Sequence, residues 1–220
     1  MVYGCAGTAV SWYDVRGMGL ISLLFSRPWS FLALAVLLLY SVIAHETAHG
    51  AVAYLFGDDT AKRRGRLTLN PIPHLDPVGA LMLFLVGFGW AKPVPVDYGK
   101  LKRNRLAFVS VALAGCAANV LLAVTALSLL HLEFIRANSP FSSLLPIVVS
   151  INVILAAFNL IPLPPLDGSK ILLSFLPEKY WRGFNRFEPY GLFLLMLLLF
   201  SGFLRPVIAL MEKGIYQIIS

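Results

Sequence analysis

Charged residues are scarce in this sequence. Only 13% of the 220 residues are Asp, Glu, Lys or Arg, whereas 58% are hydrophobic. A soluble domain usually has about a quarter charged residues, because a polar surface must cover its apolar core. The shortage therefore excludes an ordinary water-soluble fold, and the apolar character of the chain excludes disorder. The composition is that of an integral membrane protein.

Cysteine is equally scarce, and the charges that are present do not indicate a nucleic-acid-binding protein. The two cysteines are Cys5 and Cys116, and Cys116 lies inside an apolar run, so a disulfide framework is excluded. The net charge of +7 comes from basic residues in short connections between apolar runs. That arrangement is typical of membrane topology, and we expect no nucleic-acid partner.

Four apolar runs are long enough to cross a bilayer, which requires about 20 mostly apolar residues. They cover residues 29–56, 106–132, 144–166 and 190–211. A fifth run at residues 78–91 holds three glycines and is too short to cross as a helix. The connections are too short for an inserted soluble domain. We therefore expect an all-α integral membrane protein, a multi-pass helical bundle of about four long spans that forms a single domain over residues 1–220.

The basic residues predict which ends of the spans face the cytoplasm, because Lys and Arg concentrate in cytoplasmic loops. Two basic connections flank the run at residues 78–91, so both of its ends are expected in the cytoplasm. That run then enters the membrane and returns, as a short re-entrant loop or β-hairpin on the cytoplasmic side, against protein or a watery cavity. Three connections hold thirteen of the 18 basic residues: Lys62, Arg63, Arg64 and Arg66; Lys92, Lys100, Lys102, Arg103 and Arg105; and Lys170, Lys179, Arg182 and Arg186.

Two histidines and a glutamate interrupt the first long run. His45 and His49 are four residues apart, so on a helix their side chains share a face and can bind one metal ion. Glu46 flanks the same site and can act as a general base towards an activated water. Each such group costs about 2–3 kcal/mol or more to place in a spanning helix. That cost argues against a chance match and predicts a metal site.

A catalytic zinc ion commonly has three protein ligands and one open position, so a third ligand is needed. His45 lies eleven residues before Phe56, about 17 Å from that end of the run at 1.5 Å per residue. Asp167 is the candidate we favour, because the three prolines at residues 162–165 must unwind the run before it. Gly168 would then permit a tight turn. A solvated helix cap is the alternative role for Asp167.

Three further polar residues are candidates for contact with a substrate or an oxyanion. Asn159 precedes the proline-rich stretch and is the better candidate for holding a substrate backbone or an oxyanion. Asn119 lies about 20 Å into the second run, where asparagine usually bonds to a neighbouring helix. His74 could be a surface histidine, a further metal ligand or a substrate contact, and its loop is rich in turn-forming residues. We expect mainly structural roles for Asn119 and for the loop that contains His74.

These motifs together resemble the site-2 protease family of intramembrane zinc metalloproteases. The resemblance covers about residues 40–176. It rests on the H-E-x-x-H motif at residues 45–49, the N-x-x-P stretch that continues to L-D-G at residues 159–168, and the stretches at residues 65–71 and 89–96. The last two resemble the compact prokaryotic branch, which lacks a PDZ domain. One departure is Cys116, which stands where the pattern of the family has proline.

The resemblance implies a function and a set of site residues. His45, His49 and Asp167 would bind one Zn²⁺ per chain, Glu46 would be the catalytic acid/base, and Asn159 matches an active-site asparagine. The implied function is that of a zinc metalloendopeptidase that hydrolyses peptide bonds within or near transmembrane helices, in regulated intramembrane proteolysis. The expected partners are the lipid bilayer and a transmembrane substrate, a single-span regulator already cut by another protease. The expected location is the cell membrane, with the active site opening toward the cytoplasm.

Two alternatives remain open at this point. A membrane metalloprotease with a glutamate as third ligand would need Glu133, which is expected at the opposite face of the membrane. A non-proteolytic zinc-binding transporter or scaffold is the second alternative, but a transporter should have paired ionisable residues in several spans. If the protein is a protease, its substrate must be locally unwound, and residues 79–89 and 92–96 are expected to offer backbone edges for pairing.

Overall fold

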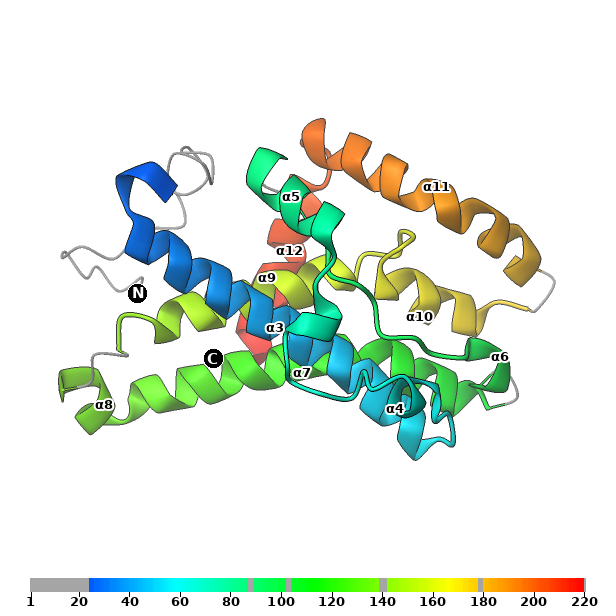
Figure 1. The fold of residues 1–220 in the computed structure, drawn as a ribbon, viewed down its shortest axis with the longest axis horizontal. Coiled ribbons are helices and arrows are strands. Elements are labelled where there is room, and N and C mark those ends of the chain that lie inside the picture. Colours follow the sequence, from blue (N-terminus) through cyan, green and yellow to red (C-terminus); the bar gives the residue numbers. More distant parts are fainter. Residues whose placement is uncertain (1–23, 87–88, 102–103, 139–141, 178–179, 220) are drawn as a thin grey trace.

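The computed structural model describes residues 24–86, 89–101, 104–138, 142–177 and 180–219 (Figure 1). The described residues form α-helices, one short 3₁₀ helix and connecting segments, and no β-strand occurs among them. The expected all-helical class is therefore confirmed. Two helices, α3 (Pro28–Leu55) and α7 (Arg105–His131), are long and apolar enough to cross a membrane.

Local sequence explains where the two long helices begin and end. α3 has Pro28 in its first turn, where a missing N–H is no loss, and it ends just before Gly57, which adopts a φ of 92°. α7 begins after Asn104, whose side chain accepts a hydrogen bond from the Ala107 N–H and caps the helix. The helix then continues without a break through Cys116.

The third and fourth apolar runs do not form continuous spans. α9 (Leu145–Asn159) ends before the three prolines, so residues 160–166 are unwound, as the absence of proline N–H groups requires. α11 (Trp181–Phe200) and α12 (Arg205–Ile219) share the fourth run, but the last part of α11 and α12 meet at 91°. If that bent pair is counted as one span, there are three candidate spans among the described residues. The expected count of about four long spans is not confirmed.

The short apolar run contains a helix where a re-entrant loop or β-hairpin was expected. α5 (Pro77–Val86) covers most of the run, and residues 87 and 88 lie outside the described part. Residues 89–97 then follow an extended path without strand pairing; we call them the 89–97 segment. Gly79 lets this segment pass the first turn of α5, since a Cβ there would lie 2.0 Å from the Trp90 carbonyl oxygen. The hairpin is not confirmed.

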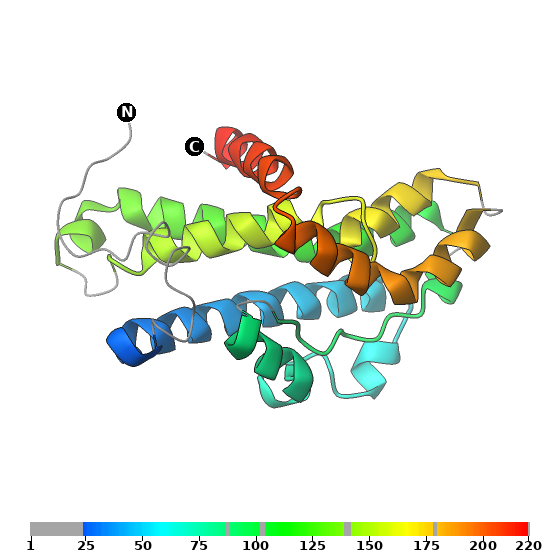
Figure 2. The same cartoon turned by 90° about the horizontal axis from the view of Figure 1, so that it is seen from above.

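The helices are arranged in layers around α3. α7 packs against both α3 and α9, and α12 packs against α9. In Figure 2, α3 lies between the α7 and α9 pair on one side and α5 with α4 (Thr60–Arg63) on the other. Small residues of α7, among them Ala112 and Gly115, are buried where α7 meets its neighbours, which permits close helix contact.

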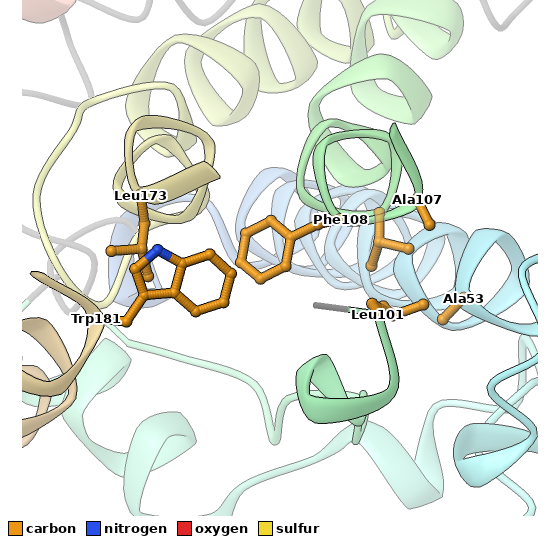
Figure 3. Close-up of a cluster of buried hydrophobic side chains, with 7 residues drawn as sticks. Ala53, Leu101, Ala107, Phe108, Leu173 and Trp181 are labelled. Atoms are coloured by element: carbon orange, nitrogen blue, oxygen red, sulfur yellow. The ribbon is translucent and has the colours of Figure 1, made fainter. Parts of the chain in front are cut away.

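A buried apolar cluster joins α10 (Asp167–Phe175) to the ends of α3 and α7 (Figure 3). Phe108 of α7 lies between two aromatic rings, with its centroid 5.0 Å from that of Tyr98 and 5.0 Å from that of Trp181. Such tilted ring pairs add about 0.5–1.5 kcal/mol to the burial of the rings. Because Leu173 of α10 belongs to the cluster, the cluster helps to fix the helix that starts at Asp167. Its buried members are Ala53, Leu101, Ala107, Phe108, Val111, Leu173 and Trp181.

Candidate metal centre

The three residues that the sequence predicts as metal ligands lie together in the structure. Asp167 Oδ2 is 3.0 Å from Nε2 of His45 and 2.9 Å from Nε2 of His49. The exposed fractions are 4% for His45, 6% for His49 and 5% for Asp167. Their ligand atoms lie close enough together to hold one metal ion, and no other such group is found among the described residues.

Hydrogen bonds behind the two imidazole rings determine which nitrogen faces the group. His45 Nδ1 lies 2.6 Å from the Asn119 side-chain oxygen, and His49 Nδ1 lies 2.7 Å from the Val111 carbonyl oxygen. Both oxygens are acceptors, so Nδ1 carries the proton in each ring. Nε2 is then the nitrogen with a free lone pair, and in both rings it is the atom that approaches Asp167. Partners of this kind orient metal-binding histidines and raise their basicity.

Asn119 belongs to a chain of buried side chains that links three helices. Its amide nitrogen donates to the Asn152 side-chain oxygen at 2.8 Å, and the Asn152 amide donates to the Ser41 hydroxyl at 3.0 Å. The expected structural role of Asn119 is therefore seen, together with a contact to His45 that the sequence analysis did not predict. One feature of the sequence could have indicated this contact. Measured from the expected cytoplasmic ends of their runs, Asn119 lies at a depth of about 20 Å and His45 at about 17 Å, so the two residues are at similar levels in the membrane.

Gly115 leaves space at the centre of the group. A Cβ on this residue would lie 2.4 Å from Nε2 of His45 and 2.4 Å from Nε2 of His49, in the space toward which the ligand atoms point. Two imidazole nitrogens and one carboxylate oxygen form a donor set that is typical of catalytic zinc. The residues present, their tautomers and the glycine cradle therefore fit a zinc ion.

The unwound stretch after α9 brings Asp167 into the group as the first residue of α10. Gly168 is needed there for close approach, because a Cβ would lie 2.2 Å from the Leu160 carbonyl oxygen and 2.5 Å from that of Ile161. The second carboxylate oxygen of Asp167 lies 3.5 Å from the Lys170 ammonium. One oxygen thus faces the histidines while the other faces a cation.

Glu46 is fixed by a different part of the chain. Its Oε2 accepts a hydrogen bond of 2.8 Å from the backbone N–H of Val94, in the 89–97 segment. The side chain is half-buried. The hydrogen bond engages one carboxylate oxygen and leaves the other available to accept a proton. The sequence predicts that Glu46 lies beside the histidines, but no pattern in it indicates the contact with Val94.

Among the hydrogen bonds and ion pairs of the described residues, none joins Asn159 or His74 to the three predicted ligands. The Asn159 amide donates to the Leu155 carbonyl one turn earlier in α9, at 2.9 Å. His74 is fully buried, with Nε2 2.9 Å from the Thr68 carbonyl oxygen, and its own carbonyl accepts from the Lys92 N–H at 2.9 Å. Those contacts connect the loop before α5 to the 89–97 segment, in keeping with the conformational role expected for that loop.

Comparison with known proteins gives the family. The sequence model of peptidase family M50 matches residues 133–201. A protein of Bacillus subtilis (strain 168) named "Putative zinc metalloprotease YwhC" is 44% identical over 174 residues, which cover 76% of this chain and 79% of that protein. "Putative zinc metalloprotease Rip2" of Mycolicibacterium smegmatis is 29% identical over 89% of this chain and 76% of its own length. No solved structure matches the chain.

The apolar helices and the buried group of two histidines and one aspartate define a membrane protein with a candidate metal centre. With the similarity to YwhC, the chain belongs to peptidase family M50, the site-2 protease family. The resemblance inferred from the sequence motifs is thereby confirmed. Membership supports a metallopeptidase activity that uses zinc, in a protein of the membrane.

Proposed function

We propose that this protein is an intramembrane zinc endopeptidase that cleaves transmembrane segments of membrane proteins, in regulated intramembrane proteolysis. The observation that carries the proposal is the position of the metal centre within α3. His45 lies ten residues before the end of α3 at Leu55, a helix apolar enough to span a bilayer. At 1.5 Å per residue, His45 lies about 15 Å from the Leu55 end of the helix. A metal centre at that depth can act on peptide bonds that lie within the membrane.

The ligands and the base divide the chemistry between them. His45, His49 and Asp167 would hold one zinc ion, which when bound supplies Lewis acidity toward the scissile carbonyl and promotes ionisation of water near neutral pH. Glu46 takes a proton from the attacking water and passes it to the leaving amine. The Val94 N–H keeps one oxygen of Glu46 engaged, so the other performs the transfer.

Asn159 is proposed to hold the substrate backbone or the oxyanion. Its amide donates one N–H to the Leu155 carbonyl in this structure, and the second N–H of the same NH2 group is the donor proposed for the substrate. Asn119 and His74 are better explained as structural residues, because both are fully buried and bonded to other parts of the chain. Neither is included in the proposed contact with substrate.

The substrate is proposed to be the transmembrane helix of a single-span regulator already shortened by another protease. Its peptide bonds must be unwound, and the 89–97 segment offers a backbone edge for pairing. Lys92 and Val94 already donate their N–H groups, to His74 and Glu46, and Pro93 and Pro95 have none. Arg66 already donates to the carbonyls of Lys92 and Pro93, so the carbonyls from Val94 onward are the acceptors proposed for the N–H groups of the substrate.

The proposed active site opens toward the cytoplasm. The support is the concentration of basic residues at the end of α3 and beyond it, since positive charge remains on the cytoplasmic side. Lys62, Arg63 and Arg64 lie directly after the end of α3 that is nearer to the metal centre.

Replacement of Glu46 by glutamine tests the proposal against a zinc transporter or scaffold. Glu46→Gln should abolish cleavage of a reconstituted transmembrane substrate while retaining zinc, because the base is lost and the three ligands remain. Glu133→Gln is the matched control, since Glu133 is exposed at the start of α8 (Glu133–Asn138) and should leave the cleavage rate unchanged. Cleavage by Glu46→Gln at the wild-type rate would refute a role for Glu46 and, with it, the proposed mechanism.

A further inference from the structure

We propose that Arg66 is a positioning residue for the proposed proteolysis: it fixes residues 92–94, so that the Val94 N–H can orient the Glu46 carboxylate. The inference rests on the proposed function, because it assigns to Arg66 an effect on the base of that reaction. Arg66 itself does not contact the metal ligands. It acts through the backbone of the 89–97 segment.

The surroundings of Arg66 are unusual for a guanidinium group. The residue is only 7% exposed, yet no ion pair with a carboxylate involves it within the described part of the chain. Its Nη2 donates to two carbonyl oxygens, that of Lys92 at 2.6 Å and that of Pro93 at 3.2 Å. Burial of a charge that is paired only with backbone dipoles is costly. What the buried guanidinium does in return is to hold the carbonyls of Lys92 and Pro93 in place through two hydrogen bonds.

The residue after these two carbonyls is the one that contacts Glu46. Besides donating its N–H to Glu46, Val94 packs its side chain against α3 one turn further on, beside Gly50. A Cβ on Gly50 would lie only 2.8 Å from Val94 Cγ1, so the glycine makes room for this contact. Both the backbone and the side chain of Val94 are therefore located against the helix that carries the base.

The 89–97 segment has few other means of holding this position. Pro93 and Pro95 cannot donate hydrogen bonds, which prevents regular strand pairing around Val94. The neighbouring anchors found among the described residues are the Lys92 N–H, bonded to His74, and the Asp97 N–H, bonded to Asp58. Between those two anchors, the contacts made by Arg66 and Glu46 are the polar contacts that fix the backbone. Loss of Arg66 should therefore release Val94 and allow the Glu46 carboxylate to rotate.

The expected effect falls on the turnover step and spares the metal. A positioned base contributes about 10²–10⁴-fold to rate, so partial loss of its orientation should lower kcat by about 10- to 100-fold. Arg66→Ala should show that loss with zinc content unchanged, and faster hydrogen exchange at the Val94 amide. Arg64→Ala is the matched control, because Arg64 is exposed two residues away, and it should keep wild-type kcat. Arg66→Lys keeps the positive charge on a shorter side chain without the guanidinium group, so its kcat should lie between those of Arg66→Ala and Arg64→Ala.

Two further measurements separate positioning from a general structural role. Methylguanidinium added to Arg66→Ala should restore part of kcat, and it should have no effect on Glu46→Gln. Val94→Pro removes the N–H itself and should reduce kcat as Arg66→Ala does, relative to Val94→Ala, which keeps the N–H. The double variant Arg66→Ala/Val94→Pro should be little worse than either single variant, because both remove the same interaction.

The outcomes are distinguishable from failure of the proposed function. If Glu46→Gln is inactive but Arg66→Ala, with full zinc, stays within twofold of wild-type kcat, the positioning role is overturned and the protease proposal stands. If Arg66→Ala does not fold, Val94→Pro decides: activity equal to that of Val94→Ala overturns the inference, and a loss of 10-fold or more supports it. If Glu46→Gln is fully active, the proposed function itself fails.

Discussion

Two sides of one turn of α3 are held in different ways. On the side that faces α7, His45 and His49 are oriented by the buried Asn119 side chain and the Val111 carbonyl, within regular helix packing. On the other side, Glu46 contacts the 89–97 segment, which has no regular pairing. The predicted metal ligands and the proposed base therefore depend on separate parts of the structure. Changes on the α7 side should alter zinc binding, whereas changes on the segment side should alter turnover or local stability and leave zinc in place.

The largest effect is expected from removal of the third ligand. Asp167→Ala should lose both zinc and activity. Its zinc affinity should fall by more than the about 10- to 100-fold that is typical when a residue hydrogen-bonded to a ligand is removed. Metal analysis of the purified protein and competition with a chelator measure the zinc, and Asp59→Ala, a surface acid paired with Arg63, is the control. A variant that keeps full zinc and full activity would show that the third ligand is another residue.

A methyl group at Gly115 should produce the next largest effect. In Gly115→Ala the new Cβ would lie 2.4 Å from both Nε2 atoms, so the rings must move and zinc affinity should fall by at least about 10-fold. Gly183→Ala is the matched control, because a Cβ there meets nothing within 4 Å in α11. Equal zinc affinity in both variants would contradict the assignment of Gly115 to the metal cradle.

Loss of the Asn119 side chain should weaken zinc binding more gently. Asn119→Ala leaves the His45 Nδ1–H without its acceptor, and the expected cost is about 10-fold in zinc affinity, at the lower end of outer-shell effects. Asn119→Asp keeps an oxygen acceptor for His45 and should retain more affinity than the alanine variant. If Asn119→Ala and Asn119→Asp bind zinc with equal affinity, the hydrogen bond to His45 does not affect zinc binding.

The smallest effect on zinc binding, none at all, is expected on the segment side, at Asp58. Burial alone would raise the pKa of this carboxyl, but hydrogen bonds from Thr60, the Asp97 N–H and Lys100 outweigh it and hold the pKa below its usual value. Because the folded pKa is depressed, the stabilisation is present above the unfolded pKa of about 3.9 and is lost as pH falls through the folded pKa. Asp58→Asn should therefore unfold more easily near pH 7, by about 1–3 kcal/mol.

Thermal unfolding in detergent at several pH values measures this contribution. The difference between wild type and Asp58→Asn should begin to shrink as the pH falls below about 4, where the unfolded carboxyl binds its proton, and it should continue to shrink until the pH has passed the lower folded pKa. Zinc content should be equal in both proteins throughout. A difference that is constant with pH would show that the charge of Asp58 does not anchor the 89–97 segment.

The grouping of His45, His49 and Asp167 was predictable because it rests on local rules. The spacing of His45 and His49 places them on one helix face whatever the rest of the fold does. The prolines before Asp167 end α9 through missing N–H groups, which is likewise a local effect. The contact between Asn119 and His45 was not predictable, because it depends on how α7 is rotated against α3.

The path of the chain outside the long helices was harder to predict. Apolar length suggested one span at residues 190–211, but length does not reveal the bend between α11 and α12, where Gly202 adopts a φ of 77°. The run at residues 78–91 was expected to be a loop or hairpin and contains α5. The bond between Val94 and Glu46 lies in a segment without periodicity, so no sequence pattern could have indicated it.

The aspartate of the metal centre lies 122 residues after the first histidine in the chain. During synthesis, α3 with both histidines is therefore made long before α10 exists, and two ligands alone form an incomplete site. Zinc binding then reports that the late part of the chain has packed against the early part. Once bound, the ion would tie these two parts together and stabilise the fold by mass action. Acquisition of the proposed zinc ion would thus be coupled to completion of folding.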